Sequence, residues 1–326
     1  MDADLFGDDV LREPETLDAL LDAYAGTRLG ALSPLAVLGD DPLAGRRVTM
    51  IGMGSSRFAA LPVAATLRSQ GVAAVAEHSS AVEQTAPGAD VVAIGISATG
   101  TTPETVAALE RHRGVSRTVA ITNDPDGPLA AAADVVLPML AGEERGGVAC
   151  RTFQATVAIL RLLAGADPAR LRRAVDAQRA LLDARADWLE PLLETLRPAH
   201  TVYAVAPSER LSSALQSALM FREGPRVAAD AAETGDWTHV DVYLSKHPGY
   251  TAMVFGGSSF DAGLMEWAGP RGATIVAIGP AIDGASSHIA FPGADDPLVA
   301  SLVEVSIAEL AAATWWRRRL DAGEMP

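Results

Sequence analysis

The stretch "GISATGTTPETVAALE" at residues 95–110 decides the fold. An apolar run at 91–96, "VVAIGI", leads into hydroxyl side chains around Gly100, and a helical pattern opens at Pro103. One hydroxyl is enough to cap a helix, and Thr102 stands in the right place to do so. The six residues 97–102 nevertheless hold four: Ser97, Thr99, Thr101 and Thr102. The other three hydroxyls therefore need a separate explanation.

Short apolar strands alternate with helices of about a dozen residues on both sides of this stretch. We expect strands at 46–54, 72–78, 91–97, 117–123 and 133–139. Helices are expected around 15–28 and across most of 148–197. This alternation is typical of a parallel sheet that helices cover on both faces.

A second series of strands and helices starts at 200–207, "HTVYAVAP", and resembles the first. "VTMIGMGSSRFAALPVAATLRS" (48–69) aligns with "VYAVAPSERLSSALQSALMFR" (202–222), and "VAIGISATG" (92–100) aligns with "MVFGGSSFD" (253–261). Matched units in the same order favour a duplication. We predict an α/β fold of two tandem, doubly wound, flavodoxin-like halves joined by helices. The expected parts are a helical segment 1–45, a first half 46–165, a helical connector 166–197, and a second half with a C-terminal helix, 198–326.

Charge and composition exclude several classes of partner. The net charge is −15 at pH 7 and aromatic residues make up 5% of the chain, so nucleic acid and anionic membranes are poor partners. The N-terminus is acidic, unlike a signal peptide, and no run approaches the ~20 apolar residues of a membrane span. We therefore expect a cytoplasmic protein. The single cysteine, Cys150, rules out an internal disulfide and is expected to be a packed residue.

The hydroxyl-rich turns predict an anion site. In open parallel sheets, ligands bind beyond the carboxyl ends of the strands, where helix N-termini favour phosphate. Ser97, Thr99 and Thr102 can add neutral donors there, and Ser55 and Ser56 are expected to form a second such turn. The sequence lacks the Gly-Lys-Ser/Thr ending of a P-loop, and "GMGSSR" has arginine where a dinucleotide fingerprint needs its third glycine.

These turns resemble those of the sugar isomerase (SIS) domain family, whose members bind phosphosugars in two tandem α/β halves. In the isomerase part of glucosamine-6-phosphate synthase, a Gly-Thr-Ser turn precedes a Ser-Gln-Ser-Gly-Glu-Thr turn. "GSS" (54–56) and "SATGTT" (97–102) take those places here, with Ala98 for the glutamine. The resemblance covers about residues 46–318. It implies phosphate contacts by Ser56, Ser97, Thr99 and Thr102, to which the turn itself adds Ser55.

The same resemblance implies further residues of the site. "GVACRTF" (147–153) resembles the family's segment that lines the sugar, so Gly54, Val148 and Ala149 are expected to contact it. Glu223 and His239 have the sixteen-residue separation of the family's acid–base pair. Such a pair can move a proton between C1 and C2 of a sugar phosphate. No metal and no cofactor are expected, and the partner is a small sugar phosphate.

Departures from the family pattern leave several functions open. Met220 replaces a lysine of the synthase, and Val240-Asp241 replaces its Gly-Pro. The glutamate–histidine pair without that lysine also resembles fructosamine-6-phosphate deglycases. An aldose–ketose isomerase, a deglycase, a non-catalytic phosphosugar-binding regulator and a subunit of a larger synthase all remain open. Because the family's histidine usually reaches a neighbouring subunit, the resemblance implies a homodimer or a higher homo-oligomer.

The remaining histidines carry weaker expectations. His78 follows the second expected strand and can border the pocket. His112, His200 and His288 fall at element ends and are expected to be solvated. His247 lies in a loop that is more typical of simple surface than of a site.

Overall fold

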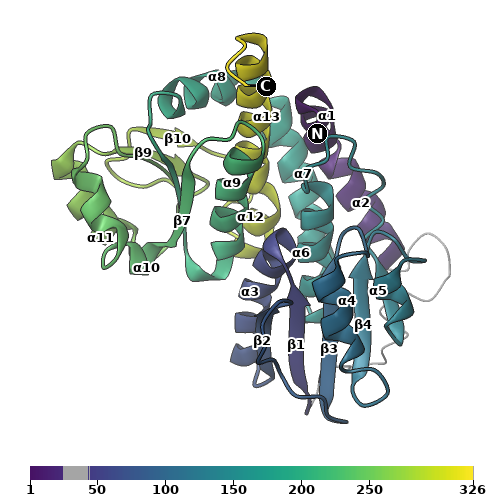
Figure 1. Cartoon of the computed structure of the whole chain (residues 1–326). Coiled ribbons are helices and arrows are strands. Elements are labelled where there is room, and N and C mark those ends of the chain that lie inside the picture. Colours follow the sequence, from purple (N-terminus) through teal and green to yellow (C-terminus); the bar gives the residue numbers. More distant parts are fainter. Residues whose placement is uncertain (25–42, 44, 326) are drawn as a thin grey trace. The chain divides into compact units, whose positions relative to one another are not determined.

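The computed structural model describes residues 1–24, 43 and 45–325. These residues form two compact units, each built around one sheet (Figure 1). The first-sheet unit comprises Glu15–Glu143 and Arg151–Arg172. The second-sheet unit comprises Met1–Pro14, Glu144–Cys150 and Arg173–Pro326. The segments 1–14 and 144–150 thus belong with the second sheet, although the chain enters that sheet only after residue 200.

The first sheet has five parallel strands in the order β2-β1-β3-β4-β5. They are β1 (Arg47–Gly52), β2 (Ala73–His78), β3 (Val91–Ser97), β4 (Arg117–Thr122) and β5 (Val135–Pro138). All seven residues of β3 are buried, which explains why its sequence is an unbroken apolar run up to Ser97. Gly95 leaves room for the helices above it, because a Cβ there would lie 3.0 Å from both Leu109 and Leu129.

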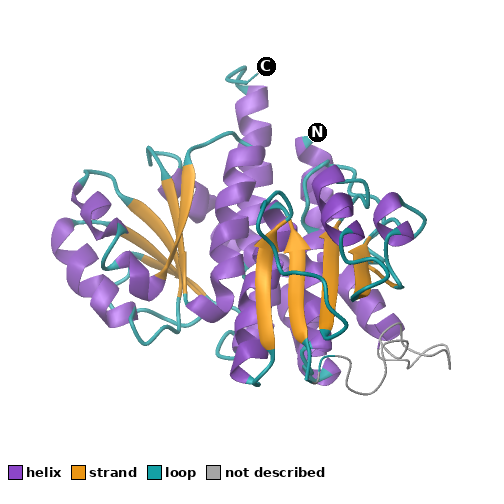
Figure 2. Cartoon of the chain, turned by 60° about the horizontal axis from the view of Figure 1, so that its bottom comes forward, coloured by secondary structure: helices purple, strands orange, loops and turns teal. Residues whose placement is uncertain are grey.

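Helices pack around this sheet (Figure 2). They are α3 (Gly54–Ser69), α4 (Pro103–Glu110), α5 (Pro128–Ala131) and α6 (Arg151–Leu163), with most of α2 (Glu13–Tyr24) in the same unit. Three of them, α3, α4 and α5, connect one strand to the next. The side chains of Val91, Ala93, Leu109, Ala120 and Leu129 form one core cluster. The helix α7 (Pro168–Asp183) passes from the first-sheet unit into the second.

The second sheet repeats this topology. Its parallel strands are β6 (Val202–Ala206), β7 (Ala229–Glu233), β8 (Thr251–Phe255), β9 (Thr274–Ile278) and β10 (Ser287–Ile289). The order β10-β9-β8-β6-β7, read from its other end, is the order of the first sheet. The predicted α/β fold of two doubly wound halves is confirmed.

The second-sheet unit is also covered on both faces. Its helices are α1 (Ala3–Leu11), α8 (Arg185–Leu196), α9 (Leu211–Glu223), α10 (Thr234–Trp237), α11 (Asp261–Ala268), α12 (Pro297–Val303) and α13 (Val305–Asp321). On one face Val205, Trp237, Tyr250, Val254 and Leu264 pack together. On the other face α9 contacts β6 and β7, and α13 packs against both α9 and α1.

One stretch of the second-sheet unit is long and apolar enough to resemble a membrane span. Residues Pro297–Asp321 have the length of a membrane span, and an 18-residue window within them has a mean hydropathy of 1.5. However, 89% of that window is buried inside the protein. The apolar character of α12 and α13 is therefore what a core helix of this unit requires.

Candidate functional site

The predicted phosphate residues gather at the switch point of the first sheet. The strands β1 and β3 are neighbours, and the chain continues from β1 to β2 on one side and from β3 to β4 on the other. In doubly wound sheets, ligands bind outside the carboxyl ends of the strands at such a point. Two segments leave this edge side by side: 53–57 after β1 and 97–102 after β3. His78, at the end of β2, pairs in register with Gly52, so it lies at the same edge.

The four hydroxyls after β3 form two pairs. The Ser97 Oγ and Thr102 Oγ1 atoms lie 2.9 Å apart. Thr99 Oγ1 accepts from the Thr101 hydroxyl at 3.0 Å and from the Thr101 N–H at 3.3 Å. Thr102 occupies the N-cap position of α4, but its side chain makes no capping hydrogen bond. Capping therefore does not account even for Thr102, and the hydroxyls are grouped around the start of a helix.

Gly100 fixes the shape of this turn. Its φ of +68° favours glycine, and a Cβ would lie 2.9 Å from Thr122 Oγ1. Its carbonyl accepts from the Leu129 N–H at 2.9 Å. The turn is therefore held against the neighbouring strand β4 and against α5.

The segment after β1 differs from the expected second turn. The helix α3 begins at Gly54, so Ser55 and Ser56 lie in its first turn. This helix starts directly against its strand, because a Cβ on Gly52 would lie 2.9 Å from the Ser56 Cβ. The N–H groups at a helix start have no intrahelical partner, and the dipole there favours negative charge. The edge thus combines the N-termini of two helices, α3 and α4.

Arg57 is a candidate site residue that the sequence reasoning missed. It follows Ser56 in the first turn of α3 and is half-buried. Burial lowers the pKa of its guanidinium, and its buried Nε atom has no hydrogen-bond partner among the described residues. A partly desolvated cation without a carboxylate partner gains most from an anionic ligand. The signal in the sequence was the arginine itself, which served only to exclude a dinucleotide fingerprint.

Replacement of Arg57 by glutamine is expected to weaken phosphosugar affinity by about 10–150-fold. Hydrogen bonds to charged groups are worth about 1.5–3 kcal/mol, and each 1.4 kcal/mol is a factor of ten. The affinity is measured by titration calorimetry. Arg68→Gln, at the exposed end of the same helix, is the matched control and should bind like the wild type. Wild-type affinity in the Arg57 variant would remove this residue from the site.

The corresponding edge of the second sheet is filled by the protein itself. Asp261 Oδ2 accepts from the N–H groups of Gly257 at 2.7 Å and Ser258 at 3.0 Å. The buried guanidinium of Arg210 is paired with Glu304 and donates to the Gly256 carbonyl. A carboxylate and an ion pair therefore occupy the switch point between β6 and β8, and the hydroxyl-rich turn of the first half has no open counterpart here.

The segment expected to line the sugar belongs to the second-sheet unit. The Ala149 carbonyl accepts from Gln216 Nε2 at 2.7 Å, which ties the segment to α9. Val148 is buried, side chain and backbone alike, whereas Ala149 is partly exposed. Gln216 and Glu223 are seven residues apart and share one face of α9, with Cα atoms about 10 Å apart along the axis. The fold thus brings Ala149 and Glu223 to the same helix face.

Glu223 is the last residue of α9 and is exposed. Neighbouring protein atoms nevertheless shield its carboxyl group partly from water, and this desolvation raises the pKa of the group. The charge of Arg222 partly opposes that shift. The turn after it is fixed, because Arg319 Nη1 donates to the Pro225 carbonyl at 2.6 Å. Arg226 then adopts a positive φ of 55°. A carboxyl with a raised pKa on a fixed helix end suits a general base.

His239 lies at the other edge of the same sheet. It follows β7 through α10, so it stands near the carboxyl edge, and its side chain is exposed. The helix α9 runs back from β6 to the start of β7, so Glu223 stands near the amino edge. A five-residue strand spans about 16 Å. Within one chain, the structure therefore does not bring Glu223 and His239 together.

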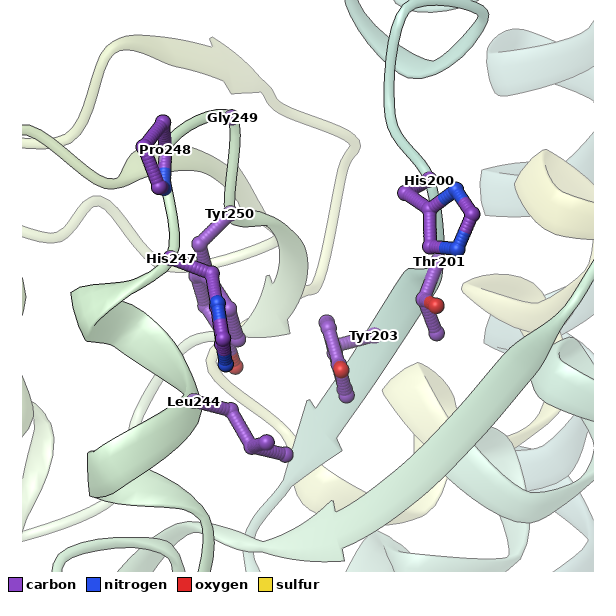
Figure 3. Close-up of a pocket in the computed structure, with 8 residues that line it drawn as sticks. All are labelled: His200, Thr201, Tyr203, Leu244, His247, Pro248, Gly249 and Tyr250. Carbon is purple, nitrogen blue, oxygen red and sulfur yellow. The ribbon is translucent and has the colours of Figure 1, made fainter.

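A cavity of about 390 Å³ lies at the amino edge of the second sheet (Figure 3). Figure 3 shows His247 and Leu244 facing Tyr203 and His200 across it. The rings of Tyr203 and Tyr250 stack with centroids 4.6 Å apart. This edge is opposite to the one where ligands of parallel sheets bind, so the cavity is not a second copy of the phosphate edge.

The histidine expectations are corrected at one position. His112 is buried, and its Nδ1 lies 2.9 Å from Ser116 Oγ, so it is not solvated. His200, His247 and His288 are exposed, as expected. Cys150 is buried and forms no disulfide, which agrees with the expected role in packing.

Comparisons with known proteins agree with this geometry. Residues 44–166, the segment that holds the strands of the first sheet, match the model of the SIS domain family. The chain is 31% identical over 228 residues to glutamine–fructose-6-phosphate aminotransferase (isomerizing) of Pyrobaculum aerophilum; the match covers 65% of this chain and 38% of that protein. The chain is also 56% identical over 54 residues to N-acetylmuramic acid 6-phosphate etherase of Symbiobacterium thermophilum. This match covers 16% of this chain and 18% of that protein. The chain thus spans less than half the length of these relatives.

Solved structures share the whole architecture. Tagatose-6-phosphate ketose/aldose isomerase from Escherichia coli superposes with a TM-score of 0.84 at 18% identity, covering 99% of this chain and 95% of that one. The C-terminal domain of glucosamine–fructose-6-phosphate aminotransferase from Francisella tularensis gives a TM-score of 0.78 at 15% identity, with 95% of each chain covered. At such identities the likeness establishes the fold.

Proposed function

We propose that the protein binds a sugar phosphate at the switch point of the first sheet and moves a proton between C1 and C2 of the sugar. The observation that carries this proposal is the convergence of two helix N-termini and of paired hydroxyls at one open edge. Its second-sheet counterpart is closed by Asp261. We assign the phosphate to five hydroxyl residues and one arginine: Ser55, Ser56, Arg57, Ser97, Thr99 and Thr102.

Glu223 is proposed as the base that takes and returns the carbon proton, and His239 as the group that shuttles protons to the ring oxygen or the leaving amine. Gly54, Val148 and Ala149 are proposed to contact the sugar. Two reactions fit these roles. One is an aldose–ketose isomerisation, and the other is the cleavage of a fructosamine 6-phosphate.

The separation of Glu223 and His239 within one chain supports a site shared between two copies. Homodimers are the commonest symmetric assembly, and a twofold axis exchanges equivalent residues between the subunits. The same separation keeps a non-catalytic phosphosugar-binding regulator as a second candidate. A chain that works alone would have no complete acid–base pair.

Mixing two inactive variants distinguishes an active site shared between two subunits from a non-catalytic regulator. Glu223→Gln and His239→Asn homodimers are each expected to be inactive, whereas mixed dimers regain one intact site of two. Because half of randomly mixed dimers are heterodimers, about a quarter of wild-type activity should return. Light scattering checks the assembly state. No recovery from subunits shown to exchange, or full activity in a monomer, would contradict the shared site.

The substrate screen comes first. Thermal shift is measured with hexose, hexosamine and fructosamine 6-phosphates and with the same sugars lacking phosphate. A stabilising sugar phosphate is then incubated with the enzyme in D₂O. Deuterium at C1 or C2 of the recovered sugar supports catalysis. Tight binding of a sugar phosphate without any exchange would favour the regulator instead.

A further inference from the structure

Two buried carboxyl groups in the second-sheet unit have no role in the site described so far. Glu13 is the first residue of α2, and Glu309 lies in the middle of α13. Both side chains are fully buried. Ser306, one helical turn before Glu309 on α13, donates its hydroxyl to Glu13 Oε2, so the two carboxyl groups lie beside each other. Two ionised carboxylates cannot share such a place at low cost, so one of them must hold a proton.

The hydrogen bonds identify which group is ionised. Glu13 Oε2 accepts from Gln178 Nε2 and from Ser306 Oγ, both at 2.6 Å. Neither oxygen of Glu309 receives a well-formed hydrogen bond within the described part of the chain. The amide of Gln216 donates to the Ala149 carbonyl, and its proximity to Glu309 only partly opposes the rise in the pKa of that carboxyl group. Hydrogen bonds to a carboxylate favour its ionised form, so Glu13 carries the charge and Glu309 is the neutral acid.

The electrostatic surroundings agree with this assignment. Burial is the largest cause that raises the pKa of Glu309 well above its ordinary value, and Glu13 is the next. Glu144, which accepts from the Cys150 N–H at 2.8 Å, adds to the same shift. The charged groups with the largest effect on Glu309 are thus both acidic.

The Glu13–Glu309 pair lies in the same unit as the contact between α1 and the segment that is expected to line the sugar. Asp9 of α1 accepts from the Gly146 N–H at 2.8 Å, and the Gly146 carbonyl accepts from the Asp2 N–H at 3.1 Å. A Cβ on Gly146 would lie only 2.4 Å from the Phe6 Cα, so α1 lies directly against this glycine. Gly146 precedes Val148 and Ala149 by two and three residues. The position of α1 therefore determines where that segment lies.

We propose that Glu13 and Glu309 share a single proton, and that this acid–carboxylate pair fastens the start of α2, directly after α1, to α13 and so positions α1 and the segment of Val148 and Ala149. Both glutamates are then positioning residues. Their effect on the ligand rests on the proposed function, whereas the shared proton does not. Loss of the proton leaves two buried negative charges in contact, which loosens α1 and the segment that it holds.

The proton is tested without any ligand by infrared spectroscopy. The difference spectrum between the wild type and Glu309→Gln at neutral pH should contain the C=O stretching band of one protonated carboxyl group. That band should disappear as the wild type is titrated to alkaline pH. Glu194→Gln, an exposed glutamate of α8, is the control and should show no such band. Absence of the band in the Glu309 difference spectrum would overturn the proposal.

The free energy of unfolding gives a second readout that needs no ligand. Because Glu309 binds its proton more tightly in the folded protein, stability should fall as pH rises above the ordinary glutamate pKa of about 4.3, until the folded pKa is passed. Glu309→Gln stays neutral and still donates to Glu13, so it should fold and lose this slope. Equal slopes in both proteins would contradict the shared proton.

Phosphosugar affinity tests the positioning role. The wild type should lose affinity about tenfold for each pH unit above the pair's alkaline transition, whereas Glu309→Gln should stay flat. The same alkaline loss in both proteins would refute positioning while leaving the proposed function intact. A wild type that binds no sugar phosphate at any pH would refute the proposed function, and the infrared and unfolding results would still decide the proton pair.

Discussion

Glu223→Gln is expected to lower turnover of the sugar phosphate by about 10²–10⁴-fold, the usual effect of losing a general acid or base. Glutamine keeps the size and hydrogen bonding of the side chain but cannot accept the carbon proton. Affinity should change little, because the proposed phosphate contacts belong to the first-sheet unit. Steady-state kinetics and calorimetry separate the two effects. Because the pKa of Glu223 is raised, wild-type activity should fall on acidification already above the ordinary glutamate range.

The control for this prediction is Glu110→Gln. Glu110 is likewise an exposed glutamate at the end of its helix, α4, and should be neutral to activity. The Glu223 variant should also stop placing deuterium at C1 or C2 in D₂O. If it turns over and exchanges like the wild type, Glu223 is not the base.

The Thr99→Val/Thr102→Val variant is expected to bind the sugar phosphate about 5–150-fold more weakly. The change removes two hydroxyl donors from the turn and leaves the anion less well paired, at a cost of about 1–3 kcal/mol. Valine keeps the shape of threonine, so the turn around Gly100 should survive. Calorimetric titration with the phosphorylated and the unphosphorylated sugar measures the loss.

Ser259→Ala is the matched control for the threonine variant. Ser259 is an exposed hydroxyl in the equivalent turn of the second sheet, which the Asp261 carboxylate fills. Its removal should leave affinity unchanged. If the wild-type protein binds sugar and sugar phosphate equally well, no phosphate site exists at the first switch point.

The sheets could be predicted from the sequence because their signal is local. The buried run of β3 and its repeat in β8 could be recognised from their apolar character, and the alternation of short strands with helices indicates a doubly wound fold. The positions of side chains at the carboxyl ends of the strands were harder to predict from the sequence. Ser55 and Ser56 fall inside a helix because α3 begins directly after β1, and nothing in "GMGSSR" indicates that register.

Contacts between distant segments could not be predicted at all. Glu13 meets Ser306 across 293 positions of the sequence, and Asp9 meets Gly146 across 137. Periodicity within one element does not indicate which element lies opposite. Buried polar groups such as Glu309 and Arg210 looked like ordinary helix residues for the same reason. Their burial depends on the packing of α13 and of the second sheet.

The carboxylate of Asp261 also bears on how the two halves behave before any ligand arrives. In the second half, the amide groups of Gly257 and Ser258 are permanently satisfied by a residue of the same chain. In the first half, no carboxylate of the described residues accepts from the first amide groups of α3 or α4. One copy of the duplicated architecture is therefore complete as soon as it folds, while the other is completed by what it binds. A bound phosphate would give the helix starts of the first half the anionic partner that Asp261 already gives the turn of the second.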